Sequence, residues 1–220
     1  MRPIFPLGTQ GLAQALSLLG GQPTGGLAAI GGDAGQLPVG GDDVVEPAAL
    51  AAIAEEPLAA KSFHFAFSAA DVTYLCHQSE GSWIEREAKE WDYPIIYIEE
   101  SEIGTLKKIQ QFSMGFPLPA ESDACAAALN ARLGDKIHAY PNACSLDITP
   151  VGVGKDQGIR TLLSVMGWDG AEVFAIGDET NDLPMLKAFD GYTLTTAREA
   201  IQKQAKEVFP SVGAMMNHYL

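Results

Sequence analysis

The pattern of apolar and polar positions is most regular in the last third of the chain. Apolar residues recur at the spacing of one helical face over residues 156–166, so the pattern predicts a helix there. Residues 173–176 form a short, wholly apolar run that ends at Gly177, which is typical of a parallel strand buried on both faces. A second helix is predicted over residues 183–188, with Asp182 at its N-cap. Helix, buried strand, loop and helix in this order predict a doubly wound α/β sheet.

The middle of the chain has a different sequence pattern, in which short strand-like and helix-like segments follow one another without a chemical motif. Alternating or β-branched runs predict strands, and Ala-rich runs predict helices. The predicted strands cover residues 63–67, 72–76, 93–98, 106–114 and 137–140, and the predicted helices cover residues 48–54 and 122–133. We interpret residues 44–142 as an auxiliary domain, inserted into a core made of residues 1–43 and 143–220.

The two ends of this core contribute further predicted elements. Residues 1–43 are rich in glycine and alanine, and three leucines can share one helix face over residues 9–20. The apolar run at residues 27–30, which is closed by two glycines, predicts a buried strand. Residues 145–148 predict another strand of the core.

The balance of charges narrows the possible partners. The 220 residues are 47% hydrophobic and carry a formal net charge of −14, so the chain can bury a sizeable core inside an acidic surface. Such a surface repels nucleic acid and anionic membranes, and it favours a divalent cation. The three cysteines form no CxxC pair, and no apolar run approaches the length of about 20 residues that a membrane helix needs. We therefore expect a cytoplasmic protein without a nucleic-acid or membrane partner.

The loop after the predicted buried strand concentrates polar side chains. Residues 177–182 read Gly-Asp-Glu-Thr-Asn-Asp, which places three carboxylates and an amide within five positions. Open α/β sheets bind ligands beyond the carboxyl ends of their strands, and hard oxygen atoms suit Mg²⁺. The loop therefore predicts a magnesium site that includes Asp178. Ordinary turn and capping roles for Asp178, Asn181 and Asp182 account for the same spacing equally well.

Two further positions suit an anion such as phosphate. Lys155 lies at the start of a predicted helix, where its charge opposes the helix dipole and calls for a compensating phosphate or carboxylate. Thr9 lies in a small loop, residues 7–11, that can present a hydroxyl and backbone N–H groups to a phosphate. For Lys155 the alternative interpretation is a solvated surface lysine, and for Thr9 it is an ordinary helix start. Each alternative is favoured when that position is considered alone.

Taken together, these stretches resemble the Cof-type haloacid-dehalogenase-like phosphatases. Residues 146–155, which end in Gly-Val-Gly-Lys, resemble the third motif of that family. Residues 173–186 resemble its fourth motif, Gly-Asp-x-x-Asn-Asp-x-x-Met-Leu. Upstream, residues 30–34 resemble the family's Asn-Gly-Ala turn, and residues 9–11 resemble a degenerate second motif.

The resemblance implies a fold, a cofactor and roles for particular residues. It implies a doubly wound, Rossmann-like core with an inserted α+β cap, and magnesium-dependent hydrolysis of a small phosphorylated metabolite that the cap selects. Asp178 would bind Mg²⁺, and Asn181 and Asp182 would support it. Lys155, as the third-motif lysine, would neutralise charge between the nucleophile and the phosphate, and Thr9 would contact the phosphate. By resemblance, then, Lys155, Asp178 and Asp182 are the catalytic residues, and Lys155, Asn181 and Thr9 bind the substrate.

One motif of the family is missing from the sequence. Members attack the phosphate with the first Asp of an Asp-x-Asp-Gly-Thr motif on the first strand, and no such motif occurs here. The resemblance therefore implies a phosphatase that is impaired or inactive, because the nucleophile is absent. A non-catalytic protein that binds phosphate or metal, or a truncated gene product, is the alternative. The missing central strand predicts a gap in the sheet, which a partner segment, residues 1–7 or a homo-oligomer could fill.

Overall fold

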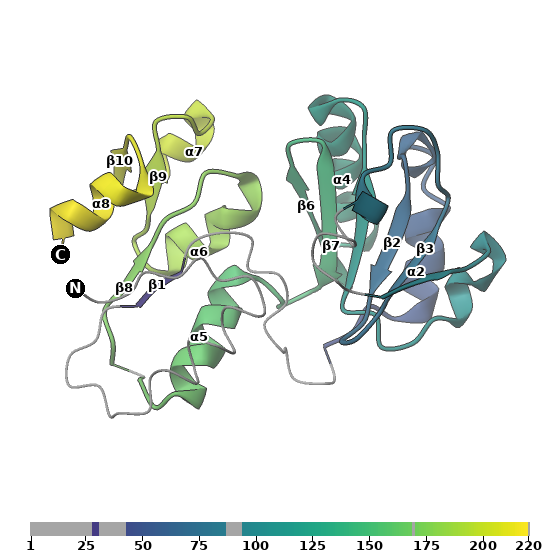
Figure 1. Ribbon diagram of the computed structural model, residues 1–220, viewed down its shortest axis with the longest axis horizontal. Coiled ribbons are helices and arrows are strands. Elements are labelled where there is room, and N and C mark those ends of the chain that lie inside the picture. The colour runs from purple at the N-terminus through teal and green to yellow at the C-terminus, as the bar shows by residue number, and fades with distance from the viewer. Residues whose placement is uncertain (1–27, 31–42, 87–93, 169, 220) are drawn as a thin grey trace. The chain divides into compact units, whose positions relative to one another are not determined.

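The chain folds into two compact units. The computed structural model describes residues 28–30, 43–86, 94–168 and 170–219. The terminal unit combines residues 1–37 with residues 154–220, and the central unit consists of residues 38–153 (Figure 1). Each unit has hydrophobic clusters of its own. In the described part of the chain, no helix is long and apolar enough to cross a membrane.

A six-stranded sheet, in the order β4-β3-β2-β5-β7-β6, forms the central unit. Its strands are β2 (Phe65–Ser68), β3 (Thr73–Cys76), β4 (Ile95–Tyr97), β5 (Gln111–Gly115), β6 (Ile137–Asn142) and β7 (Ser145–Pro150). All neighbouring pairs are antiparallel except β3 and β4, which run parallel. The helices of this unit are α2 (Pro47–Ala54) and α4 (Pro119–Leu133), with the 3₁₀ segments η1 (Ala59–Lys61) and η2 (Glu100–Thr105).

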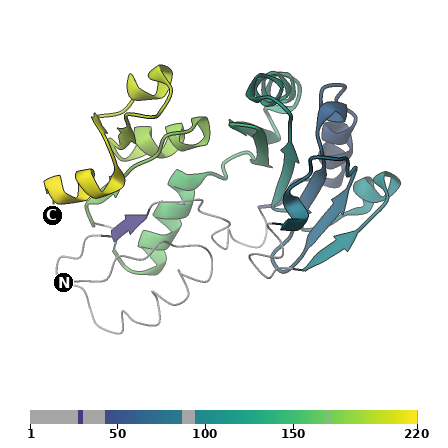
Figure 2. The ribbon, with the colours of Figure 1, turned by 45° about the horizontal axis from the view of Figure 1, so that its top comes forward.

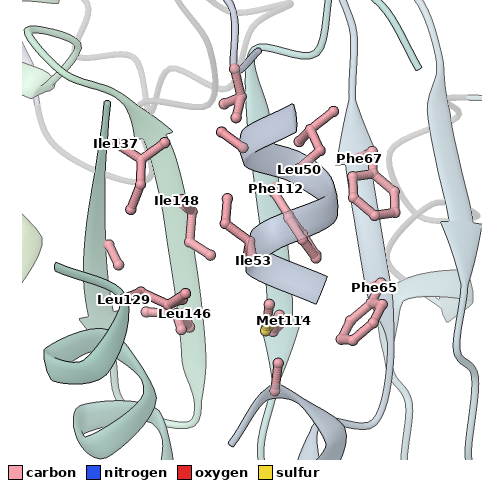
Figure 3. Close-up of a cluster of buried hydrophobic side chains, with 14 of the residues drawn as sticks. Leu50, Ile53, Phe65, Phe67, Phe112, Met114, Leu129, Ile137, Leu146 and Ile148 are labelled. Carbon is pink, nitrogen blue, oxygen red and sulfur yellow. The ribbon is translucent and has the colours of Figure 1, made fainter. Parts of the chain in front are cut away.

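The two faces of this sheet differ in chemistry because side chains alternate along each strand. In β7, Leu146 and Ile148 are buried, whereas Asp147 and Thr149 on the other face are only partly buried. The apolar face packs against α2 and α4, and Figure 3 shows side chains of both helices among those of the strands. The central members of this core are Leu50, Ile53, Phe65, Phe67, Phe112, Met114, Leu129, Ile137, Leu146 and Ile148.

The strand predicted over residues 106–114 starts later than its sequence indicates. β5 begins only at Gln111. Three residues earlier, Lys108 has a backbone φ of 58°, a left-handed conformation that an extended strand cannot contain. The predicted start is therefore wrong, although the apolar side chains Leu106 and Ile109 are still buried.

The hairpin of β6 and β7 moves the boundary between the units. The strand predicted at residues 145–148 is present, but it pairs with β5 and β6 and not with strands of the terminal unit. A tight turn at Ala143, whose φ is 50°, connects the two strands. The central unit consequently continues to Val153, beyond the boundary predicted after Asn142.

Short parallel strands alternate with helices in the terminal unit, as the sequence predicts for a doubly wound α/β fold. β1 (Ala28–Ile30) pairs with β8 (Val173–Ala175), and β9 (Tyr192–Leu194) pairs with β10 (Glu207–Phe209). An isolated parallel bridge between Ile176 and Tyr192 joins the two pairs. The helices are α5 (Lys155–Val165), α6 (Leu183–Ala188), α7 (Glu199–Gln202) and α8 (Val212–Tyr219), with the 3₁₀ turn η3 (Thr180–Asp182). The yellow C-terminal helix α8 lies beside β10 (Figures 1 and 2).

The sheet of the terminal unit shows no gap between β1 and β8. Their register places Ala28 opposite Val173 and Ile30 opposite Ala175, so the two strands are direct neighbours. The gap that the missing first motif predicts in the sheet is therefore not found between these two strands. The helix predicted over residues 9–20 lies outside the described residues.

Candidate active site

The loop between β8 and α6 is locked by its own side chains. It begins where the buried strand β8 ends, and the 3₁₀ turn η3 leads directly into α6. Glu179 precedes this turn as its N-cap, and the carboxylates of Glu179 and Asp182 each accept a hydrogen bond from the other residue's backbone N–H, as in a capping box. The carboxyl edge of a parallel sheet is where open α/β folds bind ligands, so a rigid polar loop at this edge is a candidate site.

Lys155 and Asp182 form the central ion pair of this site. The Lys155 Nζ lies 2.6 Å from Asp182 Oδ1, and the side chains are 22% and 8% exposed respectively. Lys155 is the first residue of α5, and the preceding Gly154 offers no side chain to cap the helix. A lysine at this end of a helix opposes the helix dipole, so the carboxylate of Asp182 supplies the compensating anion that the sequence calls for.

The second oxygen of Asp182 fixes the loop backbone. Asp182 Oδ2 accepts hydrogen bonds from the backbone N–H groups of Asp178 and Glu179, both at 3.0 Å. Gly177 makes this approach possible, because a Cβ at that position would lie only 2.4 Å from Asp182 Cγ. Asp182 occupies the N-cap position of α6 as predicted, but its side chain does not cap that helix and instead holds Asp178 and Glu179 in place.

Two polar atoms of the loop are buried without a hydrogen-bond partner among the described residues. They are Asn181 Oδ1 and Glu179 Oε2. Burial raises the pKa of Glu179, although the charge of Arg198 acts in the opposite direction. A buried acceptor without a donor is costly, so the Asn181 oxygen is suited to a ligand that donates a hydrogen bond or carries positive charge.

The donor set of the loop is compatible with Mg²⁺. Asp178 and Asn181 offer the hard oxygen atoms that Mg²⁺ prefers, and this ion usually takes one or two protein carboxylates and keeps several waters. Both oxygens of Asp182 already have partners, which favours a role as an anchor for Lys155 over the predicted role as a metal ligand. The described residues contain no group of three or more His, Cys, Asp or Glu side chains that could hold a metal ion by itself.

The structure brings together four of the five residues singled out from the sequence. Lys155 at the start of α5 meets the loop that carries Asp178, Asn181 and Asp182. Thr9 lies outside the described residues, as does most of the stretch that resembles the Asn-Gly-Ala turn. Sequence reasoning missed the direct pairing of Lys155 with Asp182, although an uncompensated lysine at a helix start is the signal from which it could be inferred.

Comparison with known sequences assigns most of the chain to one family. A sequence profile of haloacid dehalogenase-like hydrolases matches residues 43–214. A protein of Geobacillus stearothermophilus, described as an uncharacterized protein in the pdhA 5′ region, is 36% identical over 62 residues. That alignment covers 28% of this chain and 65% of the relative.

Solved structures with low sequence identity share the fold. A HAD/COF-like hydrolase from Plasmodium vivax has a TM-score of 0.57 at 21% identity, and the alignment covers 72% of this chain and 55% of that one. A haloacid dehalogenase-like hydrolase from B. subtilis has a TM-score of 0.59 at 17% identity, covering 78% and 68%. A sugar phosphatase of HAD subclass IIB has a TM-score of 0.59 at 20% identity, covering 80% and 67%.

These comparisons agree with the family that the sequence motifs resemble. The chain spans only 65% of the Geobacillus relative and 55% of the Plasmodium vivax hydrolase. The profile nevertheless covers well over half of the chain, including the loop after β8 and the start of α5. The protein therefore belongs to the haloacid dehalogenase-like hydrolase family, and its fold is that of the Cof-type members.

Proposed function

We propose that the protein is, by descent, a magnesium-dependent phosphatase of small phosphorylated metabolites whose turnover is impaired or lost in this chain. The observation that carries the proposal is the Lys155–Asp182 pair at 2.6 Å, which fixes a cation beside the loop of Asp178. Catalysis of phosphoryl transfer depends largely on positioning and charge neutralisation, and a lysine held in this way is suited to both.

Each residue of the site has a distinct role in this proposal. Asp182 orients Lys155 through one oxygen and the loop backbone through the other. Lys155 neutralises charge on a bound phosphate, as the resemblance to the third motif implies. Asp178, with Asn181 in support, holds Mg²⁺, which when bound polarises the phosphoryl oxygens. Thr9 is proposed to contact the phosphate.

The missing Asp-x-Asp-Gly-Thr motif limits what this site can do. Without the aspartyl nucleophile, the positioned cations can bind a phosphate, but the motif whose aspartate would attack it is absent. A non-catalytic phosphate- or metal-binding protein is therefore the second candidate function, and the unpartnered oxygen of Asn181 supports it because a ligand could satisfy that atom.

The substrate class and the setting are also part of the proposal. The sugar phosphatase among the structural relatives supports a small phosphorylated metabolite as substrate. The net charge of −14 opposes binding to nucleic acid or to anionic membranes. We further propose a cytoplasmic location and a homo-oligomer as the state that would protect an open sheet edge.

Hydrolysis of p-nitrophenyl phosphate by the full chain tests the proposal. The rate is measured with Mg²⁺ and with EDTA, beside Asp178→Ala and the exposed control Asp190→Ala. We expect the unchanged chain to hydrolyse the substrate no faster, or little faster, than the Asp178→Ala variant does. We also expect the unchanged chain to bind inorganic phosphate saturably, and Lys155→Ala to weaken this binding. Magnesium-dependent turnover that only Asp178→Ala abolishes would contradict the predicted impairment. Absence of both turnover and phosphate binding would overturn the proposed function.

A further inference from the structure

The sheet of the central unit ends in two edge strands, β4 at one side and β6 at the other. An edge strand presents backbone N–H and C=O groups to which a strand of another molecule can bind, and folded proteins commonly block such an edge. The hydrogen bonds of each edge strand show which of its backbone groups face away from the sheet. By this criterion the two edges of the central unit differ.

The edge formed by β6 is blocked. Next to the paired strands, Val151 N–H donates to Lys136 O at 3.1 Å, and alternate residues of an antiparallel strand face the same way. Ala139 and Pro141 therefore present their backbone groups away from β7. Both groups of Ala139 are bound by the side chain of Asn130 on α4: the N–H donates to Oδ1 at 2.9 Å, and the carbonyl oxygen accepts from Nδ2 at 2.8 Å. Pro141 has no N–H, so a further strand finds little to bind at this edge.

The edge formed by β4 has no comparable block in the described part of the chain. Pro94 O accepts a hydrogen bond from a backbone N–H of β3, and Ile98 N–H donates to a backbone oxygen of β3, both at 3.0 Å. In a parallel pair, alternate residues bond to the neighbouring strand, so Ile95 and Tyr97 direct their backbone groups away from β3. No described side chain binds these groups as Asn130 binds those of β6.

The side chains of β4 are also suited to pairing. Ile96 is 48% exposed and Tyr97 is 61% exposed, and the strand contains no charged residue. Side chains alternate between the two faces of a sheet, so Ile96 lies on one face and Ile95 and Tyr97 lie on the other. The charged and proline residues with which natural edge strands prevent pairing are absent from β4.

We infer that β4 pairs with the β4 of a second copy of this chain, antiparallel about a two-fold axis beside Ile96. In this register Ile95 of each copy lies opposite Tyr97 of the other, and each such pair exchanges both backbone hydrogen bonds. Ile96 lies opposite its own equivalent, so Ile96 and Tyr97 both meet apolar side chains. A contact between identical copies requires a surface that is complementary to itself, and this register meets that requirement.

The inference rests on the homo-oligomer within the proposed function, whose surface it names, and it requires neither the magnesium site nor the phosphate site. The charge of the chain predicts how the dimer responds to salt. Two copies that each carry −14 repel one another over long range, whereas the contact between the two β4 strands contains no charge. Because salt screens this repulsion, raising NaCl from about 20 mM to about 300 mM should strengthen the dimer. A dimer held by ion pairs would weaken instead, which would contradict the inference.

Sedimentation velocity of the full chain over a series of concentrations tests the inference. We expect a monomer–dimer equilibrium. Ile96→Glu brings two like charges together at the two-fold axis and should weaken the dimer about tenfold. A mixture of Ile96→Glu with Ile96→Lys should restore it, because opposite charges then meet. Val151 is an apolar residue of similar exposure, 45%, so Val151→Glu adds the same charge elsewhere and should leave the equilibrium unchanged.

Cross-linking gives a second measurement that does not depend on weakening the dimer. Opposed residues in this kind of pair have Cα atoms about 4.5 Å apart, a distance that a disulfide can span. Ile96→Cys should therefore form a disulfide-linked dimer under mild oxidation, and Val151→Cys should not.

Two results would overturn the inference. One is a chain that stays monomeric throughout the concentration series, and the other is a dimer that Ile96→Glu leaves intact and Ile96→Cys does not cross-link. Binding of inorganic phosphate, measured on the same preparations, keeps the two proposals apart. A monomer that binds phosphate would contradict only the pairing of β4, and a β4 dimer that neither binds nor hydrolyses phosphate would contradict only the proposed phosphate chemistry.

Discussion

The central unit buries one large core between its sheet and two helices and has a small second cluster around Leu75, whereas the described part of the terminal unit has only two small clusters. Strands of the central unit reach six residues, as in β6 and β7, but each described strand of the terminal unit has three. The candidate active site lies on the terminal unit. Its geometry therefore depends on individual polar contacts around Asp182 more than on the packing of apolar side chains.

The largest effect that separates the two units should come from truncating an aromatic side chain. Phe112 is fully buried in the central core, where its ring lies 4.2 Å from that of Phe67, and Phe112→Ala should cost about 3–5 kcal/mol of unfolding free energy. Phe174→Ala in the smaller cluster of the terminal unit should cost less, because Phe174 is 9% exposed. Urea denaturation measures both values, and equal losses would contradict the contrast between the units.

Acid should weaken the central unit through His64. This side chain is buried beside Trp83 and lies 3.0 Å from Ser82 Oγ; burial lowers its pKa to about 4, and the charge of His77 acts in the same direction. Because the pKa in the folded state is below the unfolded value of about 6.5, the stabilisation is complete above pH 6.5 and is lost as the pH falls towards 4. The total loss is about 3 kcal/mol.

Unfolding measured across this pH range, with His64→Gln beside the exposed control His218→Gln, checks the assignment. The acid-dependent loss should become smaller in His64→Gln, since that side chain cannot take up a proton. A steep loss that persists in this variant would show that another group is responsible.

A smaller and more local effect is expected at the candidate site. Asp182→Ala removes the partner of Lys155 and the acceptor for the N–H groups of Asp178 and Glu179, and should cost about 2 kcal/mol, reduced by the partial exposure of Lys155. Hydrogen exchange at these two amides should accelerate, while Glu199→Gln, which breaks an exposed pair with Lys203, should leave them unchanged. Unaltered protection in Asp182→Ala would refute the anchoring role.

The sequence predicts those elements that are determined locally. The helix of α5 and the strand of β8 are recognisable because their apolar spacing has a definite period, and Gly177 marks the end of the strand. The magnesium-site hypothesis starts from the same local signal, since the carboxylates follow one another within residues 177–182.

What the sequence does not reveal depends on pairing between distant positions. β7 is recognisable as a strand, but nothing within residues 145–148 indicates that β5 and β6 are its neighbours. Lys155 and Asp182 are 27 positions apart, so their ion pair emerges only from the fold. The left-handed Lys108 is likewise invisible to a propensity argument, because lysine rarely adopts that conformation.

The most direct test of the candidate site is the affinity of the full chain for Mg²⁺, measured by calorimetry with Asp178→Asn beside the exposed control Asp190→Asn. The proposal predicts saturable binding that is strongly weakened in Asp178→Asn and unchanged in Asp190→Asn. An unchanged Mg²⁺ affinity in a correctly folded Asp178→Asn protein would contradict the assignment of this loop as the metal site.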